Sequence, residues 1–193
     1  MKISIIIPTI KGREEMLKEA LDSVYNQTVL PYEIILFKGG KNNKGKINNK
    51  IAGSKCDAFI QFCDDDKLDP TYIEKTTKKM EETKADIVGT WLENFGDETG
   101  IHGFNKMPFG TSLIKKSIWK KVGGYDEDLG VGDDSDFYTM CINNGAKIES
   151  IPEPLLKYRQ HKSNWSKSGD WKESNKKRQE KYKRLEYKYN PFN

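Results

Sequence analysis

Short apolar runs alternate with amphipathic segments in the first half of the chain. Three nearly continuous apolar runs are typical of strands buried on both faces of a parallel sheet: residues 3–7, 33–37 and 58–63. Between them, residues 13–25 carry apolar side chains at helical spacing, and a helix beginning at Pro70 is expected to run to about residue 84. This alternation predicts an α/β fold with a mostly parallel, twisted sheet flanked by helices.

The second half has a less regular pattern. Residues 86–92 predict a fourth strand, and the Gly- and Asn-containing residues 95–107 predict a loop or hairpin. Further short elements are expected as strands at 111–114 and 148–151 and helices at 117–122 and 133–143. Gly145 gives the last of these helices a C-terminal stop.

Positive charge is concentrated near the C-terminus. The chain has a formal net charge of +4. Residues 172–188 alone hold eight Lys or Arg against three Glu, a local excess of +5, so the remainder is nearly neutral. Two interpretations stay open for this basic segment: a solvated helical face, or contact with an anionic membrane surface or nucleic acid.

The three cysteines, Cys56, Cys63 and Cys141, show no C-x-x-C spacing. Cys56 and Cys63 lie in or beside apolar runs, where we expect small core residues. Pro8 stops the first apolar run far short of a membrane span, and no signal peptide is expected before it. We therefore expect a cytoplasmic protein, with any membrane contact peripheral.

The leading candidate for chemistry is Asp64-Asp65-Asp66, directly after a buried strand. Adjacent carboxylates repel one another, and a divalent cation such as Mg²⁺ or Mn²⁺ relieves the repulsion. Alternating side-chain direction would place Asp64 and Asp66 on the same side. The structural alternative is an N-terminal cap and acidic first turn before the helix at Pro70.

Two further groups of polar residues follow. Asp133 and Asp134 stand at the start of a predicted helix, where the helix dipole favours negative charge and where a carboxylate can also act as a general base. Arg159 and His161 follow the last predicted strand. Either residue is a candidate for a phosphate contact, and His161 for a metal contact, although a lone histidine is more often a hydrogen-bonded surface residue.

These residues together resemble family 2 glycosyltransferases. The resemblance rests on six segments in the family's order, from about residue 3 to about residue 166: Ser4-Ile5-Ile6-Ile7-Pro8-Thr9, Ser23-Val24-Tyr25-Asn26-Gln27-Thr28, Glu33-Ile34-Ile35, Phe62–Pro70, Gly123-Gly124-Tyr125-Asp126-Glu127 and Asp133-Asp134. Six motifs in sequence are far more specific than any one of them.

The resemblance implies a GT-A fold, Rossmann-like, with a nucleotide-binding half at about 1–92 and an acceptor half at about 93–160 that carries a small antiparallel extension. Residues 161–193 would form a basic helical tail. It also implies an inverting, metal-dependent transfer of sugar from a nucleotide-diphosphate-sugar, expected to be a UDP-sugar, to a hydroxyl of a glycan or lipid-linked sugar. Mn²⁺ or Mg²⁺ is the implied cofactor.

The resemblance also implies roles for single residues. The D-x-D motif of the family is matched by Asp64 and Asp66, with His161 as a further metal contact, and Asp134 matches the catalytic base. The implied nucleotide-sugar contacts are Pro8, Thr9, Lys38, Asn48, Asp64, Asp65 and Arg159.

One segment departs from the family pattern. Lys38-Gly39-Gly40-Lys41 stands where the family has Asp-Asp-Gly-Ser, one Asp of which contacts the nucleobase, and a lysine cannot accept a hydrogen bond from a base. This departure leaves the nucleotide of the donor open, and it leaves open a catalytically inactive nucleotide- or carbohydrate-binding module. The basic C-terminal segment separately leaves open a glycosyltransferase acting on modified nucleic-acid bases. A homodimer is also left open.

Overall fold

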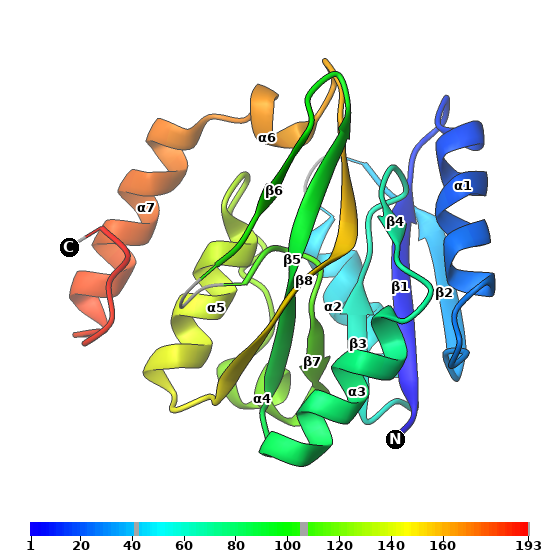
Figure 1. Ribbon diagram of the computed structural model, residues 1–193. Coiled ribbons are helices and arrows are strands. Elements are labelled where there is room, and N and C mark those ends of the chain that lie inside the picture. The colour runs from blue at the N-terminus through cyan, green and yellow to red at the C-terminus, as the bar shows by residue number, and fades with distance from the viewer. Residues whose placement is uncertain (41–42, 105–107, 193) are drawn as a thin grey trace.

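A mixed sheet with helices on both faces organises the chain (Figure 1). The computed structural model describes residues 1–40, 43–104 and 108–192. Its strands are β1 (Ile3–Thr9), β2 (Glu33–Lys38), β3 (Ala58–Gln61), β4 (Lys67–Leu68), β5 (Ile87–Gly96), β6 (Gly100–His102), β7 (Leu113–Lys115) and β8 (Ile148–Gln160). Its helices are α1 (Glu14–Tyr25), α2 (Lys44–Gly53), α3 (Tyr72–Thr83), α4 (Lys116–Val122), α5 (Asp133–Asn143), α6 (Trp165–Ser168) and α7 (Trp171–Arg184).

The strand order of the sheet is β2-β1-β3-β7-β5-β8-β4, with β6 paired to β5. Strand β1 is parallel to β2 and β3, and β5 is parallel to β8. Strand β7 lies between β3 and β5 and is antiparallel to both. The α/β prediction is confirmed, and β7 divides the parallel part into two segments. Strand β6, which is antiparallel to β5, falls within residues 95–107, which were expected to form a loop or hairpin.

Two hydrophobic cores lie on opposite faces of the sheet. Alternate residues of β1 point to opposite faces, so Ile5 joins one core and Ile6 the other. The first core is covered by α1 and α3, which contribute Val24 and Tyr72. The second is covered by α2, α4 and α5. Because helices cover both faces of the sheet, side chains on both faces of these strands are buried. This explains the nearly continuous apolar runs in the sequence.

Strand β8 is much longer than the sequence pattern predicted. Residues 148–151 are its first part, but pairing with β5 continues to Gln160 beyond Pro152 and Pro154. Because proline cannot donate to the ladder, the pairing is irregular there, with a register shift between Thr90 and Leu92. The extended end of β8 carries Arg159 toward the carboxyl end of β3.

The basic C-terminal segment is packed against the body of the protein. Figure 1 shows α7 running beside α5, away from the strands. Arg178 and Tyr182 of α7 are buried, and Lys181 forms ion pairs with Asp126 and Asp136. Part of the local positive charge is therefore used inside the structure. Among the described residues, none of the helices is long and apolar enough to span a bilayer.

Candidate active site

A cleft of about 710 Å³ opens where β1 and β3 end. One wall carries Asp64, Asp65 and Asp66 of the connection between β3 and β4, and the other carries Asp133 and Asp134 at the start of α5. Ligands of open α/β sheets bind beyond the carboxyl ends of the strands. The two acidic groups singled out in the sequence, far apart along the chain, thus line one cavity.

The acidic triplet is a turn rather than a continuation of β3. The strand ends at Gln61, and Asp64 and Asp65 form the turn, so strand-like alternation does not apply to them. Asp64 accepts hydrogen bonds from the Ile10 amide at 3.4 Å and from Arg13 Nη1 at 2.8 Å. The expected pairing of Asp64 with Asp66 is therefore replaced by a closer grouping of Asp65 with Asp66.

Arg13, just before α1, supplies positive charge to this turn. Its Nη1 lies 2.8 Å from Asp64 Oδ1 and 2.9 Å from Asp65 Oδ2. Burial opposes the charge of this guanidinium, but the hydrogen bond to Asp64 and the charge of Asp65 outweigh it, so the pKa of Arg13 is raised. Two of the three carboxylates are thus compensated by a protein cation.

Asp66 differs from its neighbours because it has no ion-pair partner among the described residues. It is 1% exposed, and its Oδ1 accepts one hydrogen bond, from the Arg159 amide at 2.8 Å. Burial and the charge of Asp65 raise the pKa of Asp66 well above its usual value, against the effect of Arg159. A cation in the cleft would favour the charged form of this carboxylate.

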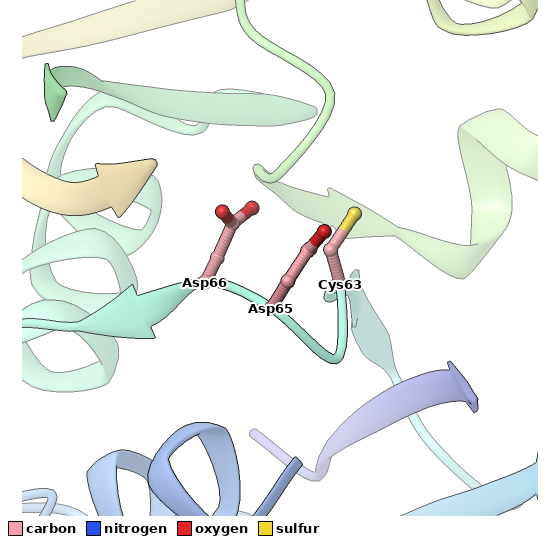
Figure 2. Close-up of side chains that lie close together, drawn as sticks. All are labelled: Cys63, Asp65 and Asp66. Carbon is pink, nitrogen blue, oxygen red and sulfur yellow. The ribbon is translucent and has the colours of Figure 1, made fainter. Parts of the chain in front are cut away.

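Cys63 joins Asp65 and Asp66 in the cleft. One ligand atom from each of the three side chains lies within 4.8 Å of the others. Figure 2 shows the three side chains projecting to the same side of the turn. The prediction of Cys63 as a core residue was wrong: it is half-buried and lines the cleft, whereas Cys56 is buried as expected. Burial raises the pKa of the Cys63 thiol well above its usual value, and Asp66 and Asp65 raise it further.

The opposite wall contains the start of α5. Asp133 Oδ2 lies 3.1 Å from Lys44 Nζ, which also donates to Gln61 Oε1 at 3.0 Å. Burial raises the pKa of Asp133, and Lys44 opposes that effect. Asp134 lines the cleft without an ion pair among the described residues. Asp133 is thus paired with a cation, whereas the Asp134 carboxylate faces the cleft without one among the described residues.

No protein-family model matches the chain. Two curated relatives do match: the uncharacterized glycosyltransferase MJ1057 of Methanocaldococcus jannaschii, 28% identical across 81% of this chain and 70% of that protein, and the uncharacterized glycosyltransferase YwdF of Bacillus subtilis, 26% identical across 79% and 72%. The crystal structure of S. aureus TarS 1-349 with UDP-GlcNAc shares the fold at a TM-score of 0.74 and 12% identity, across 88% of this chain and 62% of that one. The chain is a glycosyltransferase of the GT-A fold.

A second TarS structure, in complex with UDP, matches this glycosyltransferase at a TM-score of 0.70 and 13% identity. The chain spans 61% of that structure's length, and at this identity the likeness concerns the fold. The predicted GT-A fold and enzyme class are therefore confirmed.

The structure places some of the residues predicted to contact the donor in the cleft lining and others outside it. Pro8 lines the cleft, together with the acidic turn. Thr9 and Lys38 end β1 and β2 near the same edge but are not among the lining residues, and Lys41 lies outside the described residues. The side chain of Lys38 is exposed, and its carbonyl accepts from Lys46 Nζ.

Asn48 connects two parts of the fold. Its Nδ2 donates to the Tyr125 carbonyl at 2.8 Å, and its Oδ1 accepts from the Tyr125 amide at 2.9 Å and from Trp119 Nε1 at 3.2 Å. Its amide is thereby used within the protein, outside the cleft lining. The residue positions α2 against the Gly123–Tyr125 region, and a donor contact by Asn48 stays a prediction.

Arg159 and His161 support the acidic turn from β8 and its end. Arg159 Nε donates to the Asp65 carbonyl and its Nη2 to Glu19, both at 2.8 Å. His161 Nε2 lies 3.0 Å from Asp65 Oδ2. Its Nδ1 accepts from the Ser163 amide at 3.2 Å, which places the ring proton on Nε2. Both residues act on the turn through Asp65. A phosphate contact by Arg159 and a phosphate or metal contact by His161 stay predictions.

The sequence pattern did not indicate that Arg13 and Lys44 belong to the site or that Cys63 lies in the cleft. Lysine and arginine are abundant in this chain, and neither cation stands in a recognisable motif. Lys44 is nonetheless a lysine at 6% exposure, an unusual degree of burial for this residue type. Only the pairing of the start of α2 with the start of α5 reveals its place.

Proposed function

We propose that this glycosyltransferase belongs to family 2 and transfers a sugar, with inversion, from a UDP-sugar to a hydroxyl of a glycan or lipid-linked acceptor. The observation that carries the proposal is that the acidic turn after β3 and the Asp133-Asp134 start of α5 line the same cleft. An arrangement of this kind offers one wall for a sugar diphosphate and another for a base.

The donor is proposed from the cleft and from the structural relatives. TarS has been solved with UDP and with UDP-GlcNAc, at the fold that this chain shares. On this chain, Pro8, Arg13 and Asp64 lie at the strand ends where the nucleotide would bind. A guanidinium suits a diphosphate because of its fork of donors.

A divalent cation, Mn²⁺ or Mg²⁺, is part of the proposal. The donor set fits one: Asp66 is a buried carboxylate with no protein cation of its own among the described residues, next to Asp65. Oxygen ligands of this type suit both ions. When bound, the cation would supply charge neutralisation for the departing nucleoside diphosphate.

Asp134 is the proposed general base. The acceptor hydroxyl would give its proton to the Asp134 carboxylate while its oxygen attacks the anomeric carbon from the face opposite the leaving group. One displacement of this type inverts the configuration. Asp133 is unsuited to this role because Lys44 holds its Oδ2.

The alternative of transfer to modified nucleic-acid bases gains little from the basic segment. Arg178 and Lys181 are used in packing α7 against the body of the protein. The cytoplasmic location is also part of the proposal, supported by three cysteines that are free thiols.

The test uses the full chain with UDP, GDP, ADP and UDP-GlcNAc, each with and without Mn²⁺. A ligand that binds only the folded state raises the unfolding midpoint. We expect a cation-dependent shift with UDP and release of UDP from a UDP-sugar, with inversion read from the anomeric NMR coupling of the product. Absence of any nucleotide-induced shift would instead leave the inactive binding module as the better account.

A further inference from the structure

We propose that Cys63 supplies a sulfur ligand to the divalent cation bound by Asp65 and Asp66, so that the site prefers borderline ions such as Co²⁺ and Zn²⁺ over Mg²⁺. This inference rests on the proposed function, because it concerns the same cation. It adds a ligand that is neither a carboxylate nor a histidine.

Geometry singles out this cysteine. Its Sγ and a carboxylate oxygen from each of Asp65 and Asp66 lie within 4.8 Å of one another, and the side chains point the same way from the turn (Figure 2). Cys63 also lines the cleft. By contrast, Cys56 and Cys141 are buried in the core between α2, α4 and α5.

The carboxylates beside Cys63 retain ligand capacity. Asp65 uses Oδ2 for both Arg13 and His161, and Asp66 uses Oδ1 for the Arg159 amide. Among the described residues, no hydrogen bond reaches Asp65 Oδ1 or Asp66 Oδ2. Each carboxylate thus keeps one oxygen for a cation.

Charge gives an independent reason for a cation next to Asp66 and Cys63. Arg13 is paired with Asp64 and Asp65, whereas Asp66, at 1% exposure, has no paired cation among the described residues. A buried carboxylate without a counter-ion is costly. The carboxylate that lacks a protein cation therefore lies on the Cys63 side of the turn and not on the Asp64 side, and a bound cation would favour its charged form.

The chemistry of binding is a simple exchange. A bond forms between the metal and Sγ, the S–H bond breaks, and the proton is released to solvent, as expected for a thiol ligand. Thiolate favours softer ions, while carboxylates alone suit Mg²⁺ and Mn²⁺. A mixed set of one sulfur and two oxygens should therefore shift the preference of the site away from Mg²⁺.

Cobalt spectroscopy of the full chain tests the ligand directly. Titration with Co²⁺ alone should produce visible d–d bands and a near-ultraviolet sulfur-to-cobalt charge-transfer band. Cys63→Ser should keep the d–d bands, lose the charge-transfer band and bind Co²⁺ about tenfold more weakly. Cys56→Ser, a buried cysteine away from the cleft, should keep both bands. Cys63→Asp should bind Mg²⁺ more tightly than the parent chain does.

The outcomes separate this inference from the proposed function. Visible d–d bands without a charge-transfer band in the parent chain would overturn sulfur ligation and leave a carboxylate cation site intact. Absence of all cobalt bands would overturn the cation part of the proposed function and the sulfur ligand with it. A charge-transfer band that survives in Cys63→Ser but is lost in Cys56→Ser would also overturn the assignment. Circular dichroism establishes that each variant is folded.

Discussion

Lys44 and Asp133 form an ion pair that joins the first turn of α2 to the first turn of α5. Lys44 Nζ lies 3.1 Å from Asp133 Oδ2, and the two side chains are 7% and 21% exposed. The ammonium also lies 4.4 Å from the ring centroid of Tyr125. The pair therefore links the strand-end wall of the cleft to the wall that carries Asp134.

Lys44→Met should destabilise the protein by about 3 kcal/mol, because it leaves the Asp133 carboxylate largely buried without its cation. Urea unfolding measures the change. Lys44→Met combined with Asp133→Asn should recover most of the loss, since no charge is then stranded. Lys46→Met, on the exposed side of the same helix, should change little. Equal losses in the single and double variants would contradict this account of the pair.

Asp134→Asn should lower the rate of sugar transfer by about 10²–10⁴-fold, the usual contribution of a general base. UDP binding, followed by calorimetry, should stay within about twofold, because Asp134 is not placed on the diphosphate wall. Asp128→Asn, an exposed acid in the preceding loop, serves as the control and should transfer normally. Full transfer by Asp134→Asn would remove this residue from the role of base.

Much of the fold followed from local pattern, because buried parallel strands and amphipathic helices leave periodic signals. The strands at residues 3–7 and 33–37 and the helix beginning at Asp133 appear where they were expected, and the strand expected at 58–63 ends earlier, at Gln61. The position of β7 between β3 and β5 was not predictable, because the sequence of a three-residue strand does not indicate which strands it pairs with. The length of β8 was hidden by two prolines that its irregular pairing with β5 tolerates.

The acidic parts of the site were visible because carboxylates cluster in sequence at a strand end and a helix start. Their partners were not, because each comes from a distant element: Arg13 reaches Asp64 across 51 residues. Cys63 was misread because an apolar run gives no information on where its last side chain points. The path of the chain between the end of β3 at Gln61 and the turn at Asp64 and Asp65 decides that direction.

Lys181→Met should destabilise the protein by about 3 kcal/mol, because Asp136 would lose its ion pair while fully buried. Lys181 Nζ lies 2.7 Å from Asp136 Oδ2, whose side chain is 0% exposed, and 2.8 Å from Asp126 Oδ2. Lys177→Met removes an exposed cation from the same helix and should cost well under 1 kcal/mol, roughly what a surface pair contributes. Thermal unfolding distinguishes them, and similar midpoints would show that α7 is not held by Lys181.

Asp66→Asn should stabilise the metal-free protein at neutral pH but not in acid. Burial raises the pKa of Asp66 in the folded chain. Between the ordinary aspartate pKa of about 3.9 and this raised pKa, the folded state therefore holds a proton that the unfolded state has lost. The free energy of unfolding of the parent chain therefore falls as the pH rises between these two pKa values. The Asn variant does not lose this stability, because Asn does not titrate. We expect a gain of about 1 kcal/mol near pH 7 that disappears near pH 4.

Unfolding midpoints measured in EDTA over that pH range test the sign, with Asp97→Asn as an exposed control. Adding Mn²⁺ at neutral pH should reverse the order, because the cation stabilises the parent chain by mass action and the variant has lost a ligand. A difference between parent and variant that stays constant with pH would mean that Asp66 does not titrate differently in the folded and unfolded chains. A variant that still gains from Mn²⁺ as much as the parent would place the cation elsewhere in the cleft.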